Sequence, residues 1–149
     1  MKRDLDLSEF MPYLINRVGA ALVERFTQDA LSGTQLTIGT WRLLLAMSNH
    51  EGTRQVDLAE LTSIEVSTVS RLVTRLVQRS LVSRARSSRS NREVVVSLTP
   101  KGKALVGSLV PIAAALEQAA TRGVTKAELT AVKRVLRRMH RNLTERDDE

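Results

Sequence analysis

The stretch that decides the fold runs from Asp57 to Leu98 and reads DLAELTSIEVSTVSRLVTRLVQRSLVSRARSSRSNREVVVSL. Its first half predicts a short helix over residues 57–62 and a longer helix over residues 66–79, because apolar side chains recur there at steps of three and four. Only three residues separate the two helices. Two helices joined by so tight a turn have the spacing of a helix-turn-helix.

The hydrophobic period changes after Ser80. Residues 81–86 and 93–98 are rich in β-branched side chains and predict two strands. The six residues between them, 87–92, read SSRSNR and are polar loop formers. We therefore expect a hairpin with a long basic tip directly after the second helix of the helix-turn-helix.

Two helices precede this stretch. Apolar residues at helical spacing predict a first helix from Met11 to Leu31, with Pro12 tolerated in its first turn. Thr37 is a plausible cap for a second helix, which the polar segment at His50 ends.

Two more helices follow the hairpin. Thr99 and Pro100 are typical of a helix start, and we expect this fifth helix to end at Gly123. Thr125 and Glu128 fit a capping box for a sixth helix. Its apolar residues alternate at steps of three and four, as in a coiled-coil seam that needs a partner helix. They are Leu129, Val132, Leu136, Met139 and Leu143.

The charge is unevenly distributed. The chain has 23 basic and 16 acidic residues, a net charge of +7 and a pI near 10.7, which favours a polyanionic partner such as nucleic acid, with an anionic membrane surface as the competitor. Between residues 66 and 103, Glu93 is the single acidic residue against nine basic ones, so the excess is concentrated there. The nine are Arg71, Arg75, Arg79, Arg84, Arg86, Arg89, Arg92, Lys101 and Lys103.

The helix over residues 66–79 has two faces. At about 100° per residue its Val and Leu side chains gather on one side, which predicts a core face. Ser67, Arg71, Thr74 and Gln78 lie opposite, flanked by Arg75. Arg can fork onto guanine, and Ser, Thr and Gln can bond base edges or phosphates, so these residue types suit direct readout of DNA. An ordinary solvated helix face is the alternative.

The hairpin carries its own basic residues. Arg89 and Arg92 lie on the tip, and Arg86 lies on its approach. A thin tip with Arg side chains can enter a minor groove while the strands contact phosphates. A charged edge that prevents aggregation is the alternative interpretation.

Several classes of function find little support. The chain has no cysteine, which excludes a disulfide, a thiolate metal site and thiol-based redox sensing. The chain has two histidines, His50 and His140, and its sequence has no motif that combines them with a nucleophile, a base or further metal ligands. We therefore expect neither an enzyme nor a cofactor. The low aromatic content argues against stacking on single-stranded RNA. No run reaches the roughly 18 apolar residues of a membrane span and the start lacks a secretion signal, so we expect a cytoplasmic protein.

Taken together, these segments resemble the MarR family of winged-helix transcriptional regulators. The similarity is continuous from residue 57 to residue 102, and six helices with a late hairpin cover nearly the whole chain. Trp41, Arg42, Leu43 and Leu44 also look like the family's second helix. The other residues that carry the resemblance are Leu58, Ala59, residues 67–73 (STVSRLV), Arg75, Leu76, Leu81, Val82, Arg92 and residues 96–102 (VSLTPKG).

The resemblance implies a mainly α fold with a small β-hairpin, consisting of a winged helix-turn-helix plus a helical dimerisation region. We expect one MarR-like domain over residues 1–149, with a DNA-binding lobe at 36–99 and dimerisation segments at 8–33 and 100–145. A homodimer, joined through the first, fifth and sixth helices, would bind a pseudo-palindromic duplex. The resemblance places Ser67, Thr68, Ser70 and Arg71 in the major groove and Arg92 in the minor groove. The full set of expected DNA contacts is Ser67, Thr68, Ser70, Arg71, Thr74, Arg75, Arg86, Arg89 and Arg92.

Three positions depart from the family pattern. Ser90 stands where the family's wing usually has an Asp that orients the minor-groove Arg, here Arg92. Ser80 replaces the Gly that usually follows the recognition helix, at a cost if the backbone there is left-handed. Arg54 stands where a Thr often caps the short helix.

The resemblance also implies a crevice for a small phenolic or carboxylate ligand between the dimer-forming helices and the DNA-binding lobe. Tyr13 and Arg17 on the first helix and Trp41 and His50 on the second are the residues we expect to face it. An Arg beside aromatic rings can pair an anion while the rings cover an apolar body. We therefore expect a repressor that a small anionic aromatic or acyl effector releases from DNA. An architectural or constitutive DNA-binding protein without an effector is the alternative.

Overall fold

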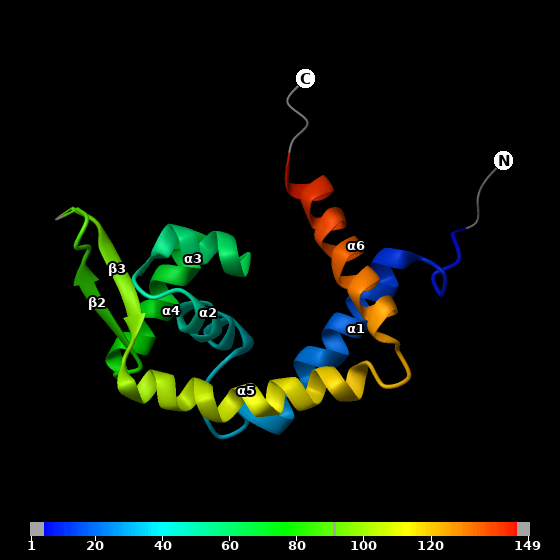
Figure 1. Ribbon diagram of the computed structural model, residues 1–149, viewed down its shortest axis with the longest axis horizontal. Helices are drawn as coiled ribbons and strands as arrows, with labels where there is room; N and C mark the ends of the chain where they lie inside the picture. Colours follow the sequence, from blue (N-terminus) through cyan, green and yellow to red (C-terminus); the bar gives the residue numbers. More distant parts are fainter. Residues whose placement is uncertain (1–4, 91, 146–149) are drawn as a thin grey trace. The chain divides into compact units, whose positions relative to one another are not determined.

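The computed structural model describes residues 5–90 and 92–145, so the predicted loop residue Asn91 lies outside the described residues. The chain divides into two compact units, Met1–Leu116 and Glu117–Glu149. The elements, labelled in Figure 1 where there is room, are α1 (Met11–Phe26), η1 (Thr27–Leu31), α2 (Ile38–Asn49), β1 (Thr53–Arg54), α3 (Gln55–Thr62), α4 (Val66–Gln78), β2 (Val82–Arg86), β3 (Val94–Leu98), α5 (Pro100–Ala120) and α6 (Lys126–Thr144). The predicted fold class is confirmed: within the described residues, six α-helices accompany one small sheet.

The predicted first helix starts at Met11 as expected, but its last turn is different. Residues 27–31 form a π-turn, η1, in which Ser32 N–H donates to Thr27 O at 2.9 Å. In a regular α-helix Leu31 would lie about 140° from Phe26, whereas the wider turn brings both side chains toward the same side. Phe26 and Leu31 are buried, and the Phe26 ring packs against Trp41 with the centroids 5.2 Å apart.

Helix α2 begins at the predicted cap. The Thr37 hydroxyl accepts from the Thr40 N–H at 3.3 Å, and the Thr40 hydroxyl accepts from the Thr37 N–H at 2.8 Å. These two bonds satisfy donors that the first helical turn would otherwise leave free. The helix then contributes several side chains to the core of the first unit. The fully buried core side chains are Leu43, Leu44, Met47, Leu58, Val69, Val73, Leu76 and Val96.

The predicted helix-turn-helix is present as α3 and α4. Helix α3 begins at Gln55, two residues before the predicted start, and its cap residue Arg54 makes no capping bond with its side chain. Ser63 adopts a left-handed conformation with φ 54°, which turns the chain between the two helices. The two helices share the core of the first unit, where Leu58 of α3 and Val69 and Val73 of α4 are fully buried.

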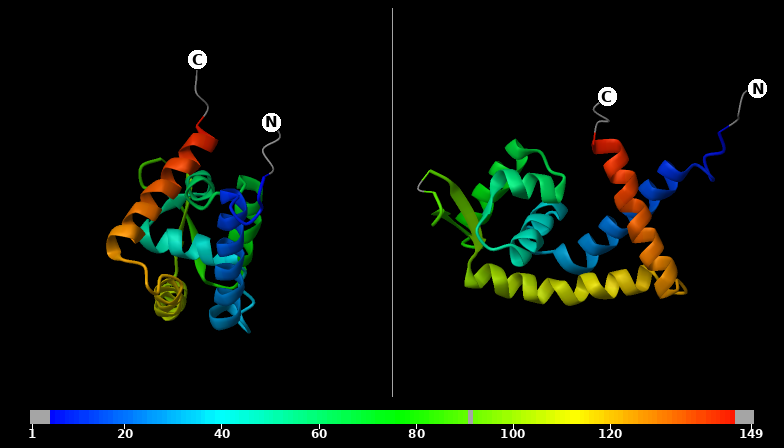
Figure 2. Two further views of the ribbon diagram at one scale, coloured as in Figure 1. Left: turned by 90° about the vertical axis from the view of Figure 1, so that its right-hand side faces the viewer. Right: turned by 45° about the horizontal axis from the view of Figure 1, so that its top comes forward.

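The predicted hairpin is part of a three-stranded antiparallel sheet in the order β1-β3-β2. The two-residue strand β1, which the sequence analysis missed, pairs Thr53 with Val96 and Arg54 with Val95. Strands β2 and β3 pair from Val82↔Leu98 to Arg86↔Val94. The hairpin projects away from α2, α3 and α4 in Figure 1 and in the right-hand view of Figure 2.

A tight junction joins the hairpin to α5. The Thr99 hydroxyl accepts from the Gly102 N–H at 3.0 Å and donates to Ser80 O at 2.6 Å, so the predicted cap also ties the helix start to the end of α4. Gly102 is buried, and a Cβ added there would collide with the carbonyl oxygen of Leu81. A glycine is required at this position by close backbone approach.

The second unit contains the end of α5 and all of α6. Helix α5 ends at Ala120, three residues before the predicted end, and Gly123 has a positive φ of 82° in the turn that follows. The predicted capping box of α6 is confirmed, with Thr125 N–H donating to Glu128 Oε2 at 2.8 Å and Glu128 N–H donating to Thr125 Oγ1 at 3.2 Å. The Thr125 N–H and the Thr125 hydroxyl both donate to Glu128 Oε2, and these two bonds lower the pKa of the Glu128 carboxyl. Val132, Val135, Leu136 and Leu143 are exposed along α6.

The serine after α4 has the left-handed conformation that the sequence analysis considered costly. Ser80 has φ 59°, its N–H donates to Val77 O at 2.9 Å, and Leu81 N–H donates to Leu76 O at 3.0 Å. These two bonds form a Schellman motif, whose left-handed position favours glycine.

We expect Ser80→Gly to raise the free energy of unfolding by about 0.5–1 kcal/mol, because the left-handed strain of about 1–2 kcal/mol is partly offset by the extra freedom of glycine in the unfolded chain. Denaturant unfolding measures this change. Ser32→Gly is the matched control, since Ser32 has a φ of −56° that carries no such strain. A Ser80→Gly variant no more stable than Ser32→Gly would contradict the assignment.

Candidate nucleic-acid interface

Helix α4 separates a core face from an outer face, as predicted. Val69, Val73 and Leu76 are buried. On the other side the exposed residues are Ser67, Ser70, Arg71, Arg75 and Gln78, while Thr68 and Thr74 are half-buried. The outer face therefore presents hydroxyl, amide and guanidinium groups in one row, the chemistry that reads base edges in a major groove.

Three hydrogen bonds order this outer face and tie it to strand β2. Arg71 Nη2 donates to Thr68 Oγ1 at 3.2 Å, which holds one edge of the guanidinium and leaves the other edge available for a bidentate contact. Thr74 Oγ1 donates to Ser70 O at 3.0 Å and accepts from Arg84 Nη2 at 2.8 Å. The Thr74 hydroxyl thus links the outer face of α4 to strand β2. Its contact with DNA stays a prediction.

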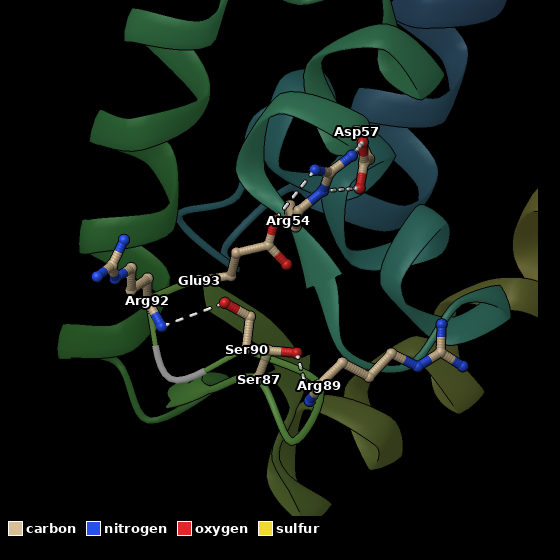
Figure 3. Close-up of polar contacts among 7 residues, drawn as sticks. All are labelled: Arg54, Asp57, Ser87, Arg89, Ser90, Arg92 and Glu93. Carbon is tan, nitrogen blue, oxygen red and sulfur yellow. Dashed lines mark hydrogen bonds and ion pairs between the residues drawn. The ribbon is translucent and has the colours of Figure 1, made fainter.

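The hairpin tip presents Arg89 and Arg92, both exposed. Ser87 N–H donates to Glu93 O at 2.8 Å, and the serine hydroxyls of Ser87 and Ser90 accept from the backbone N–H groups of Arg89 and Arg92 at 3.2 and 3.4 Å. Figure 3 shows the two guanidinium groups leaving the tip in different directions. Among the described residues, no carboxylate forms an ion pair with Arg92, consistent with the serine at position 90.

Arg54 is a residue of this site that the sequence analysis did not propose. Its Nε and Nη2 donate to the two carboxylate oxygens of Asp57 at 2.8 and 2.7 Å, and its Nη1 donates to Glu93 Oε1 at 3.4 Å (Figure 3). The hydrogen bond from Arg54 lowers the pKa of the Asp57 carboxyl, and the two carboxylates raise the pKa of the guanidinium. Arg54 to Asp57 is a short-range spacing visible in sequence, but nothing there points to Glu93.

Three basic residues of the segment bond to other parts of the first unit. Arg79 Nη2 donates to Thr34 O at 2.8 Å, Lys101 Nζ donates to Arg79 O at 3.1 Å, and Lys103 forms an ion pair with Glu51 at 2.7 Å. These three fasten elements of the first unit to one another. The basic residues expected to contact DNA are Arg71 and Arg75 on α4 and Arg86, Arg89 and Arg92 on the hairpin.

The four residues predicted to bind an effector have different surroundings in the single chain. On α1, the Arg17 guanidinium lies over the Tyr13 ring, 5.6 Å from its centroid. Trp41 is a core residue with 6% of its surface exposed. His50 lines a cavity of about 380 Å³ whose lining residues do not include Tyr13, Arg17 or Trp41. The lining residues are Arg42, Leu45, Ala46, Asn49, His50, Leu61 and Thr62.

Within residues 5–90 and 92–145, no group of three or more His, Cys, Asp or Glu side chains has the arrangement of a metal site. None of the described helices combines the length and the hydropathy that crossing a bilayer requires.

A helix-turn-helix followed by a basic β-hairpin defines a winged helix-turn-helix protein. The MarR family model matches residues 36–94. The repressor NicR of Pseudomonas putida is 28% identical over 134 residues, which cover 90% of this chain and 84% of NicR. BpsR of Bordetella bronchiseptica, whose DNA binding is regulated by 6-hydroxynicotinic acid, is 30% identical with a TM-score of 0.75, covering 87% of this chain and 97% of the BpsR chain.

A MarR family regulator from Silicibacter pomeroyi has a similar fold, with a TM-score of 0.84 and 27% identity over 97% of this chain and 99% of that one. The chain belongs to the MarR family of transcriptional regulators.

Proposed function

We propose that the protein is a homodimeric transcriptional repressor that binds pseudo-palindromic duplex DNA and is released by a small aromatic or acyl anion. The observation that carries DNA binding is the outer face of α4, where Ser67, Ser70 and Arg71 are exposed over a buried apolar face, next to a basic hairpin. NicR and the Silicibacter pomeroyi protein are transcriptional regulators. We therefore propose DNA binding rather than catalysis, and a cytoplasmic location, where the DNA would be.

We propose that α4 and the hairpin tip contact different grooves of the DNA. Residues 36–99 form the DNA-binding lobe, with Ser67, Thr68, Ser70 and Arg71 in the major groove. Arg89 and Arg92 enter the minor groove, while Thr74, Arg75 and Arg86 contact the backbone or base edges. Binding to fragments of genomic DNA, followed by sequencing of the retained fragments, tests this proposal. Retention of fragments without a shared two-fold motif would contradict it.

The proposed dimer uses residues 8–33 and 100–145. Its support is the exposed apolar surface of both segments: Met11, Leu14, Ile15 and Val18 on α1, and Val132, Val135, Leu136 and Leu143 on α6. Exposed apolar side chains at this density on one helix face indicate a protein interface. In a symmetric dimer the two recognition helices would lie about 34–36 Å apart, in successive major grooves.

The proposed effector is a small anion with an aromatic or acyl body. BpsR, which is 30% identical, responds to 6-hydroxynicotinic acid, and this chain has a solvent-exposed Arg17 stacked on Tyr13. The effector can release DNA only by binding more tightly to a dimer geometry in which the recognition helices no longer match successive grooves.

We expect a hydroxylated aromatic carboxylate to lower the affinity for operator DNA by about 5- to 150-fold at saturation, the usual range of coupling between two ligand sites. Titration of aromatic acids and their coenzyme A thioesters against the protein–DNA complex measures this effect. Arg17→Ala should weaken the response, whereas Arg25→Ala should keep it, since Arg25 on the same helix is paired with Asp29 at 2.6 Å. Equal responses of the two variants would remove Arg17 from the site.

A further inference from the structure

One guanidinium connects the two DNA-reading parts of the molecule. The Arg54 side chain donates two hydrogen bonds to the Asp57 carboxylate in the first turn of α3 and one to the Glu93 carboxylate at the base of the hairpin tip. The planar guanidinium group allows this arrangement, because its Nε and Nη2 can bind one carboxylate while Nη1 still donates to a second carboxylate. A lysine could not make both contacts in this way.

Mostly polar groups line the space between the hairpin tip and the helix side. The pairing of β1 with β3 ends at Arg54↔Val95, so Glu93 lies just beyond it. A cavity of about 570 Å³ separates the tip from β1 and α3, and among the described residues Val95 is its one large apolar lining side chain. The polar lining residues are Glu51, Arg54, Asp57, Ser87, Ser88, Arg89 and Glu93. The tip therefore rests on polar contacts rather than on packed apolar side chains.

We propose that Arg54 is a positioning residue that fixes the hairpin tip relative to the helix-turn-helix. With the tip held in this way, α4 can contact the major groove while the tip contacts the adjacent minor groove of the same duplex. This inference rests on the proposed DNA-binding function. Glu93 is adjacent to Arg92, and holding the Glu93 side chain restricts the directions in which the Arg92 guanidinium can leave the tip. Arg54 thereby acts on minor-groove preference without itself contacting a base.

The ion pairs of Arg54 are exposed, with 48% of the Arg54 side chain and 45% of the Glu93 side chain accessible. Exposed pairs contribute little to the free energy of unfolding. Breaking the Arg54–Glu93 pair is therefore expected to increase the motion of the tip and to reduce DNA selectivity, while the melting temperature stays the same. The base of the hairpin keeps its separate link from Arg84 to Thr74 on α4.

The first measurement needs no DNA. Steady-state heteronuclear NOE values for the backbone amides of residues 87–92 report motion of the tip in the free full-length protein. Glu93→Gln and Arg54→Lys should each lower these values, while Glu51→Gln, which breaks the neighbouring exposed pair with Lys103, should not. The melting temperature should stay the same in all three. Unchanged amide values in Glu93→Gln would overturn the positioning role.

The second measurement uses duplexes that share one operator and differ only in A·T-rich or G·C-rich flanks. We expect Glu93→Gln and Arg54→Lys each to reduce the flank preference by about threefold, within the range of a single exposed pair. The double variant should lose no more than either single variant, because both remove one link. Additive losses, or equal weakening on every duplex, would refute the link. Failure of the parent protein to bind any duplex would instead overturn the proposed function, while the amide measurement still tests the positioning of the tip.

Discussion

Arg71→Ala is expected to weaken binding to the operator by about 1–3 kcal/mol, or roughly 5- to 150-fold, and to relax the preference at one base pair of each half-site. The physical reason is the exposed position of Arg71 on the outer face of α4, with one edge of the guanidinium held by Thr68. A guanidinium oriented in this way can donate two parallel hydrogen bonds to guanine, and alanine can donate none.

Binding measured across all single base-pair substitutions of the operator separates this role from simple charge. Arg25→Ala removes the same charge from α1 and should change neither affinity nor profile by more than about twofold, since exposed ion pairs such as Arg25–Asp29 contribute little. Arg86→Ala should weaken every sequence alike and reduce the salt slope by about one, as expected of a phosphate contact. A base-substitution profile that Arg71→Ala leaves intact would show that Arg71 reads no base.

The elements whose causes are local were predictable from the sequence. The cap at Thr37, the capping box at Thr125 and the strand–loop–strand pattern of residues 81–98 depend on residues a few positions apart, and the structure confirms them. The two faces of α4 were predictable for the same reason, because helical periodicity fixes which side chains share a side. At Ser80, the family resemblance pointed to a position that usually holds glycine, and the structure shows the left-handed conformation there.

The features that the sequence analysis missed have tertiary causes. Strand β1 has two residues and exists through pairing with Val95 and Val96, more than 40 positions away. The π-turn at residues 27–31 accompanies the packing of Phe26 on Trp41. That packing joins two helices and cannot be predicted from local propensity. The earlier start of α3 is the exception, because its first turn is joined to Arg54 by a local pair in which the Asp57 carboxylate accepts two hydrogen bonds.

The candidate site divides in the same way. The residue types and spacing of α4 and of the hairpin tip predicted which side chains are exposed, and the structure agrees for Arg71, Arg89 and Arg92. Spacing could not show that Thr74 is bonded to Arg84 or that Arg54 reaches Glu93, since both links join segments that approach only in the folded chain. Trp41 was assigned to the effector crevice, whereas an aromatic residue on an apolar helix face is more often part of the core, as its burial here illustrates.

The second large effect is expected from Leu136→Glu on α6. Leu136 is 43% exposed within the single chain and lies among the exposed Val132, Val135 and Leu143. A two-fold symmetric interface would bury the substituted carboxylate twice per dimer, next to apolar side chains and without a partner charge. We expect the dimer to dissociate at micromolar concentration and the affinity for the full operator to fall at least 100-fold, toward the non-specific level, because each monomer carries one recognition helix.

Sedimentation velocity measures the association, and binding to the full operator and to a single half-site measures the consequence. Thr130→Glu is the matched control, because it adds the same charge about 120° around the helix from Leu136, away from the apolar row. It should leave dimer and affinity unchanged. The milder Leu136→Ala should raise the dimer dissociation constant about 10- to 100-fold while α6 stays helical by circular dichroism, which separates loss of the interface from loss of the fold. If Leu136→Glu remains a dimer and keeps its operator affinity, the interface does not include this row, and the exposed apolar residues of α1 become the surface to substitute next.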